Sequence, residues 1–274
     1  LSIQNSLDRS PEDTVAGMGA AAEELMGAPG RAVACGSGVP GPLDIARKTL
    51  IRATNLRLWK NVPYPDLLGK RLGIPTFMEN DANCAAWGEY VAGWGRGVDS
   101  LVLYTLGTGV GGGIIIAGEL WLGASGAAGE LGHITVDPNG TKCGCGQNGC
   151  VEQFASATAV ARRWGRGSAK ECFEAARQGD RTALDVVDWS ADGLAQGVAS
   201  MIHVLHPDII VLAGGMALAG DLLLDRVRAG VRKRVFEVFL EKIRIEASRV
   251  SGDDAGWLGA ALWAARKTRV QPRP

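Results

Sequence analysis

One histidine and three cysteines lie close together in residues 129–153, GELGHITVDPNGTKCGCGQNGCVEQ. His133 precedes Cys143 by ten residues, and Cys145 and Cys150 follow. The glycine, proline and asparagine residues between them let the backbone turn repeatedly, so the four side chains can face one point. Zinc prefers four tetrahedral nitrogen and sulfur ligands, and a closed set of this kind suits a structural ion. We therefore predict a structural zinc site, although the spacing is not that of a zinc finger.

Two other interpretations of the cysteines remain open. A disulfide would use two of the three and leave one unpaired, and nothing else in the sequence indicates an oxidising compartment. Buried cysteines without a ligand are common, but three of them among glycines in a polar loop are not typical of core packing. The ligand types and their spacing favour zinc over both.

Two carboxylates flank the same loop. Glu130 lies three residues before His133, and Glu152 lies two residues after Cys150. A loop folded around a metal would bring both carboxylates towards one place. Exposed ion pairs would explain each residue separately. Convergence on a polyhydroxyl ligand would explain both, because carboxylates accept strong hydrogen bonds from sugar hydroxyls.

Asparagine and aspartate also occur at a predicted strand-to-helix junction, in the sequence ENDAN at residues 79–83. Either residue could simply cap the helix that follows. A carboxylate fixed at such a junction can also act as a general base. Position alone does not separate the two roles.

Glycines interrupt the most apolar stretch of the chain, residues 101–122. The pattern predicts a strand, a tight glycine turn and a second strand. The turn could be an ordinary hairpin. It could also bind phosphate, because glycines allow backbone N–H groups to approach an anion closely. No Walker lysine follows, so this is not a P-loop.

These motifs together resemble the ROK family (repressors, open reading frames and sugar kinases), through GELGH and CGCGQNGCVEQFAS in particular. The resemblance implies that the histidine and three cysteines hold zinc. It implies that Glu130, Glu152 and His133 contact a sugar. It also implies that Asp81 is the general base and that Asn80 binds a neighbouring sugar hydroxyl.

The resemblance implies further contacts that the residues alone do not establish. Gly41, in the GVPGP turn, and Asn55, in the triplet TNL where the family often has PNL, would line the sugar site. The nucleotide, bound as Mg²⁺-ATP, would lie along four residues: Thr108 and Gly109 near its terminal phosphates, and Gly214 and Gly215 beside its adenosine.

Alternating strands and helices indicate an α/β protein. The periodicity predicts helices at 11–26, 66–72, 156–163, 169–178, 181–206, 222–239 and 254–265, and strands at 31–39, 74–78, 208–213 and 243–247. The resemblance implies the two-lobed actin-like ATPase fold (ribonuclease H-like, hexokinase type), with sugar and ATP in the cleft between the lobes. We expect a smaller lobe from residues 1–98 plus 256–268, a larger lobe from 99–255, and a frayed tail from residue 267 to residue 274.

Composition argues against several other classes of protein. Lysine plus arginine equals aspartate plus glutamate, at 29 each, so the formal net charge of zero does not favour a nucleic-acid or membrane-surface protein. No secretory leader or uninterrupted apolar helix is evident. We expect a cytoplasmic protein with reduced thiols, without nucleic-acid or membrane partners, and, from the resemblance, a homodimer.

One family motif is missing from the 274 residues, namely the DxGGT phosphate loop with which kinases of this kind open. Either the sequence is an N-terminal truncation or the protein lacks this element, and a truncation could equally hide the helix-turn-helix domain of the family's repressors.

The first expectation is ATP-dependent phosphorylation of a hexose at its 6-hydroxyl, with glucose favoured. N-acetylmannosamine, N-acetylglucosamine or fructose kinases, a sugar-sensing repressor and a non-catalytic sugar-binding module are the alternatives.

Overall fold

The computed structural model describes residues 8–27, 32–53, 56–250 and 254–270. The chain forms two compact units, and each is described by itself. The first unit comprises residues 1–88, 122–128 and 255–274, and the second comprises residues 89–121 and 129–254. Within the described residues, no helix combines the length and apolarity that crossing a membrane requires.

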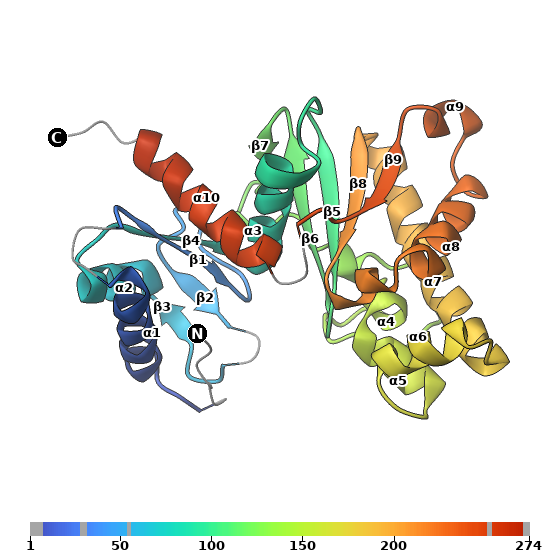
Figure 1. Ribbon diagram of the computed structural model, residues 1–274, viewed down its shortest axis with the longest axis horizontal. Helices are drawn as coiled ribbons and strands as arrows, with labels where there is room; N and C mark the ends of the chain where they lie inside the picture. The colour runs from blue at the N-terminus through green and yellow to red at the C-terminus, as the bar shows by residue number, and fades with distance from the viewer. Residues whose placement is uncertain (1–7, 28–31, 54–55, 251–253, 271–274) are drawn as a thin grey trace. The chain divides into compact units, whose positions relative to one another are not determined.

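The first unit contains two small sheets and four helices among its described residues. Strand β1 pairs in parallel with β4, and β2 pairs in antiparallel with β3. The elements, labelled in Figure 1, are α1 (Pro11–Met26), β1 (Cys35–Val39), β2 (Leu50–Arg52), β3 (Lys60–Val62), α2 (Tyr64–Leu72), β4 (Thr76–Asn80), α3 (Asp81–Gly88) and α10 (Asp254–Val270).

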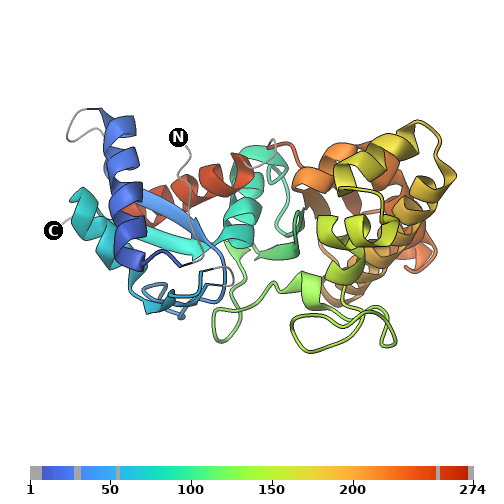
Figure 2. The same cartoon turned by 90° about the horizontal axis from the view of Figure 1, so that it is seen from below.

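Local sequence explains where α1 and α2 begin and end. The Ser10 hydroxyl caps α1 by accepting the Asp13 N–H at 3.0 Å, and Pro11 occupies the first turn, where its missing N–H costs nothing. Gly73 ends α2 in a left-handed conformation with φ of +69°. The two helices lie side by side (Figures 1 and 2).

Glycines allow close packing around the strand that leads to ENDAN. A Cβ on Gly36 in β1 would lie 1.9 Å from the Ala260 carbonyl oxygen of α10. A Cβ on Gly259 would lie 1.7 Å from the Cys84 carbonyl oxygen of α3. Helix α10 therefore packs backbone to backbone against both β1 and α3, which holds the β4–α3 junction firmly within this unit.

The second unit is built on a five-stranded sheet in the order β7-β6-β5-β8-β9. Strands β5, β8 and β9 are parallel, whereas β6 and β7 are antiparallel to their neighbours. The strands are β5 (Leu101–Leu106), β6 (Val110–Ile116), β7 (Glu119–Leu120), β8 (Ile209–Ala213) and β9 (Arg244–Ala247). All five residues of β8 are buried, as expected for a strand inside a parallel sheet.

Helices and short helical turns complete the second unit. They are η1 (Glu89–Gly93), η2 (Leu131–His133), α4 (Glu152–Ala155), α5 (Ala157–Trp164), α6 (Ala169–Arg177), α7 (Arg181–Leu205), η3 (Gly215–Ala219), α8 (Asp221–Arg232) and α9 (Glu237–Leu240). Helices α7 and α8 lie side by side (Figure 1) and belong to the main core of this unit.

Three expected helices differ from the structure. The helix predicted over 222–239 is wrong as a single element, because α8 ends at Arg232 and the buried side chain of Val235 turns into the core before α9 begins. The helix expected after ENDAN changes to the π-helical turn η1 at Glu89. Helix α10 continues to Val270, so residues 267–270 are helical rather than frayed.

Candidate functional site

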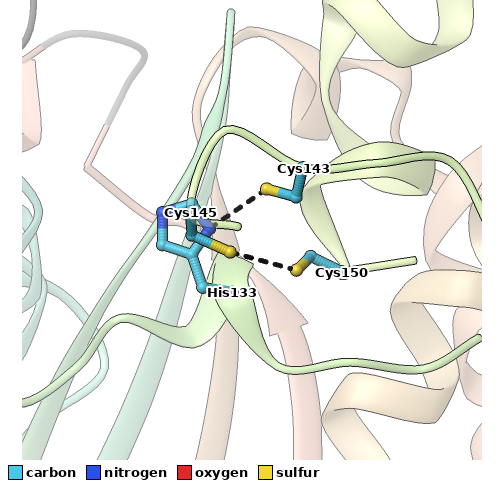
Figure 3. A group of neighbouring side chains, drawn as sticks. All are labelled: His133, Cys143, Cys145 and Cys150. Carbon is cyan, nitrogen blue, oxygen red and sulfur yellow. Dashed lines mark hydrogen bonds between the residues drawn. The ribbon is translucent and has the colours of Figure 1, made fainter. Parts of the chain in front are cut away.

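The four predicted zinc ligands converge in the second unit (Figure 3). One ligand atom from each of His133, Cys143, Cys145 and Cys150 lies within 4.8 Å of the other three. The Cys143 sulfur is 3.5 Å from Nδ1 of His133, and the sulfurs of Cys145 and Cys150 are 3.6 Å apart. All six cysteines are free thiols, so the disulfide interpretation is wrong for this structure.

The donor set and its spacing fit a tetrahedral divalent ion. With metal–sulfur bonds of about 2.3 Å and metal–nitrogen bonds of about 2.0 Å, tetrahedral angles separate the donors by about 3.5–3.8 Å. The Cys143–His133 pair, at 3.5 Å, and the Cys145–Cys150 pair, at 3.6 Å, have this separation. Burial raises the pKa of the Cys150 thiol to about 12, whereas the Gln147 backbone N–H lowers the pKa of Cys145. A bound cation would favour the thiolate form of each cysteine.

The loop around this cluster is shaped by its own backbone. The Cys143 N–H donates to the Gln147 carbonyl at 2.8 Å, which closes a tight turn around Cys145. Gly149 adopts φ of +58°, and a Cβ there would lie 1.7 Å from the Asp137 carbonyl oxygen. Glycine at this position is therefore needed to bring Cys150 towards the other three ligands.

Glu152 connects the metal-ligand loop to the glycine turn between β5 and β6. Its Oε2 accepts the Val110 N–H at 3.0 Å, and its Oε1 lies 3.9 Å from the Cys143 sulfur. Glu130 is more exposed, and its Oε2 lies 3.8 Å from Nε2 of His133. The structure thus places both flanking carboxylates next to the metal-ligand cluster.

The predicted phosphate turn and the glycines after β8 lie at one edge of the sheet. Strands β5 and β8 are parallel neighbours, so the segments that follow them share their carboxyl-terminal edge, where open α/β sheets bind ligands. Gly214 has φ of +87°, and a Cβ there would lie within 3 Å of the Leu106 backbone. Gly215 has open space around it. Thr108 and Gly109 lie in the turn between β5 and β6.

A threonine that sequence reasoning missed holds this turn. The Thr158 hydroxyl donates to the Thr108 carbonyl at 2.8 Å, and the Ala157 N–H donates to the Gly107 carbonyl at 2.8 Å. Both donors belong to the first turn of α5. No spacing in the sequence relates residue 158 to residue 108, so only the fold reveals this contact.

In the first unit, the ENDAN motif forms the turn from β4 into α3. The Asn80 Oδ1 caps α3 by accepting the Ala82 and Asn83 N–H groups at 3.0 and 3.2 Å. Asp81 is the first residue of α3, and its Oδ1 accepts the Ala82 N–H at 2.9 Å. Surrounding protein atoms partly desolvate this carboxyl and raise its pKa, although the residue remains accessible to solvent. Asn80 is thus a helix cap, while Asp81 stays exposed to solvent at the first position of α3.

Of the two remaining predicted sugar contacts, only Gly41 is described. It has φ of +105°, and a Cβ there would lie 2.2 Å from the Arg52 carbonyl oxygen, so the tight turn itself requires glycine. Asn55 lies outside the described residues.

Comparison with known proteins places these residues in a family. The sequence profile of the ROK family matches residues 3–267. The chain belongs to the ROK family. This ROK chain is 41% identical over 245 residues to a glucokinase of Thermotoga maritima, covering 82% of this chain and 77% of the relative. It is 34% identical over 234 residues to a putative xylose repressor of Caldicellulosiruptor, covering 78% of this chain and 58% of that longer protein.

Solved structures confirm the expected fold. The ROK chain superimposes with a TM-score of 0.83 on a ROK family glucokinase from Streptomyces griseus, solved in complex with glucose and AMPPNP. The two sequences are 34% identical, and the match covers 96% of this chain and 91% of the other. This ROK chain therefore has the mixed α/β, actin-like ATPase fold that the sequence implied.

Proposed function

We propose that this chain catalyses ATP-dependent phosphorylation of a hexose at its 6-hydroxyl, with glucose as the substrate. The observation that carries the proposal is the likeness, over nearly the whole chain, to an S. griseus glucokinase that binds glucose and an ATP analogue. The metal-ligand loop and the ENDAN motif are intact here. Together, the loop and the motif would supply the groups that bind sugar hydroxyls and the group that accepts a proton, which sugar phosphorylation needs.

In this proposal, Asp81 is the general base that accepts the proton of the attacking hydroxyl. Its accessible carboxylate suits this role. Asn80, Glu130, His133 and Glu152 hold the sugar hydroxyls, and Gly41 and Asn55 line the same site. Hydrogen bonds that the sugar hydroxyls donate to these carboxylates, together with bonds to the amide, would fix the hexose so that one hydroxyl is presented for reaction.

Backbone N–H groups at Thr108 and Gly109 would bind the terminal phosphates, and Gly214 and Gly215 would border the adenosine. Preorganised donors of this kind stabilise the charge that develops on the transferred phosphoryl group. Magnesium bound with ATP would neutralise part of the same charge. The Thr158 hydroxyl fixes the carbonyl of Thr108 and thereby the direction of the turn.

Zinc, held by His133 and the three cysteines, would serve as a scaffold rather than a reactant. All four ligand positions come from protein, which leaves no coordination site for substrate. The metal would orient His133 and, through the loop, Glu152.

We also propose that the protein acts as a cytoplasmic homodimer. Light scattering tests the oligomeric state, and a monomer mass at working concentration would reject the dimer.

A coupled assay with ATP and each of glucose, N-acetylmannosamine and fructose tests the proposal. Glucose is expected to give the highest kcat/KM. A preference for another of these sugars would keep the reaction and correct the substrate. Sugar binding without turnover would favour the repressor or the binding module, although a sugar sensor has no use for the base that Asp81 would supply.

The pH dependence of kcat/KM should report the raised pKa of Asp81. A general base works only when ionised, and the raised pKa means that protonation begins at a higher pH than for an ordinary aspartate. We therefore expect kcat/KM, which reports the ligand-free enzyme, to fall on the acid side through a pKa above that of an ordinary aspartate. Glucose binding, measured at the same pH values, should change much less. An acid limb at or below the ordinary aspartate value would contradict this expectation.

Replacing Gly109 with alanine is expected to raise the KM for ATP and lower kcat, together by about tenfold or more. The new Cβ would lie 2.6 Å from Oε2 of Glu152, which is held by the Val110 N–H, so the carboxylate and the turn cannot both keep their positions. Gly107→Ala is the matched comparison, since a Cβ there has nothing within 4 Å. Equal effects of the two substitutions on steady-state kinetics would show that the Glu152 contact is irrelevant.

A further inference from the structure

A buried ion pair lies directly behind the ENDAN turn. Oε2 of Glu79, in β4, accepts a hydrogen bond from Nε of Arg47 at 2.9 Å, and the two side chains are 0% and 9% exposed. By contrast, both side chains are at least 28% exposed in eight other ion pairs among the described residues. Burying two charges costs desolvation that apolar side chains of similar size would avoid. Stability alone therefore does not account for this pair.

The second oxygen of Glu79 holds the turn that contains Asp81. Oε1 accepts the Asn80 N–H and the Asn83 side-chain amide, each at 3.0 Å. These two asparagines flank the proposed base on either side. Asn80 in turn caps α3, so one carboxylate fixes both the strand end and the helix start.

The guanidinium of Arg47 extends the same network to two other segments. Besides its bond to Glu79, it donates through Nη1 to the Asp44 carbonyl and through Nη2 to the Gly126 carbonyl, each at 3.0 Å. Arg47 adopts a left-handed conformation with φ of +57°, which bulky residues rarely do without tertiary support. A Cβ on Gly126 would collide with Nη1, so glycine is required where the guanidinium docks.

Each of these segments adjoins, along the chain, a residue proposed to contact sugar. The loop of Asp44 and Arg47 follows the turn of Gly41, and the segment of Gly126 continues to Glu130. Within the first unit, one ion pair thus connects the base-bearing turn to two segments that adjoin other proposed hexose contacts along the chain. Geometry of this kind must be fixed before reaction, because small displacements of reacting groups cost large factors in rate.

We propose that the Arg47–Glu79 pair is a positioning element for the phosphorylation of the hexose: it holds the Asn80–Asn83 turn and the adjoining segments in the conformation that sugar binding and proton transfer require. This inference rests on the proposed function for its ligand. Neither residue touches the reacting atoms in this account. Both act through the residues that they hold.

Two variants, Glu79→Gln and Arg47→Lys, test the proposal. Glutamine keeps the shape of Glu79 but removes its charge, and lysine keeps the charge of Arg47 but cannot reach three acceptors. We expect each to lower kcat/KM for glucose by at least about tenfold, with the KM for ATP within twofold of the parent protein. Glu246→Gln is the control, because it removes the partner of Arg228 from a 2.8 Å ion pair in the second unit and should leave glucose kinetics unchanged.

Hydrogen exchange supplies a second readout that does not depend on turnover. In the sugar-free protein, the backbone amides of residues 80–83 should exchange at least about tenfold faster in both variants than in the parent protein. The amides of residues 122–128 should also exchange faster in Arg47→Lys. The control variant Glu246→Gln should leave the exchange of both segments unchanged. If the parent protein phosphorylates no hexose, the proposed function fails, and exchange still decides whether the pair holds these segments. Folded variants with parental exchange and glucose kinetics within twofold would overturn the inference. If Glu79→Gln does not fold, Arg47→Lys alone decides by the same two measurements.

Discussion

Replacing Asp81 with asparagine is expected to lower kcat by about 10²–10⁴-fold while changing the dissociation constant for glucose by no more than about tenfold. Asparagine has nearly the same shape, and its side-chain oxygen can still accept the Ala82 N–H that Asp81 accepts at 2.9 Å. What it cannot do is accept the proton of the attacking hydroxyl. Steady-state kinetics together with calorimetric glucose binding measure the two effects separately.

Asp66→Asn is the matched control for this substitution. It also removes a carboxylate from the first turn of a helix in the first unit, but at an exposed position of α2 that has no proposed contact with substrate. Parental kinetics are expected for it. Losses of similar size in glucose binding and in kcat for Asp81→Asn would mean that Asp81 holds the sugar rather than accepting its proton.

The second large effect is expected from the metal-ligand loop. Cys145→Ser should reduce bound zinc from about one equivalent to a small fraction, since even residues that only support metal ligands change affinity by about 10–100-fold. Loss of the ion should lower the thermal midpoint of unfolding and weaken glucose binding, because His133, Glu130 and Glu152 are oriented by the same loop. Metal analysis, thermal unfolding and calorimetry measure these three consequences.

Cys35→Ser serves as the control, because Cys35 is a half-buried thiol of β1 outside the ligand cluster. It should retain the metal. An unchanged zinc content in Cys145→Ser would eliminate Cys145 as a ligand. Loss of zinc with parental glucose binding would retain the ligand assignment but remove the scaffolding role of the ion.

Periodicity and ligand spacing predicted much of the fold and the metal site. The four metal ligands lie within 18 residues, and glycines between them signal the turns, so their convergence could be inferred from the chain alone. The glycine hairpin of β5 and β6 was equally evident. The end of α8 at Arg232 was not, because Gly230 lies inside the helix and no glycine or proline separates α8 from α9, so only the burial of Val235 explains it.

Contacts between distant segments could not be read from the sequence. Arg47 and Glu79 are 32 residues apart, and Arg47 and Gly126 are 79 apart. In the sequence, Glu79 resembles any charged residue at a strand end, and only its complete burial reveals its function in the network. The Thr158 contact with Thr108 spans 50 residues and depends on the register of α5 against the sheet.

The most direct test of the central claim is to incubate ATP and glucose with the protein as the gene encodes it, and to follow ATP, ADP and glucose 6-phosphate by phosphorus NMR. We expect one glucose 6-phosphate for each ADP formed, and formation of both products at least about 10²-fold slower with Asp81→Asn. ADP without sugar phosphate, or tightly bound glucose with no consumption of ATP, would contradict the assignment of this chain as a hexose kinase.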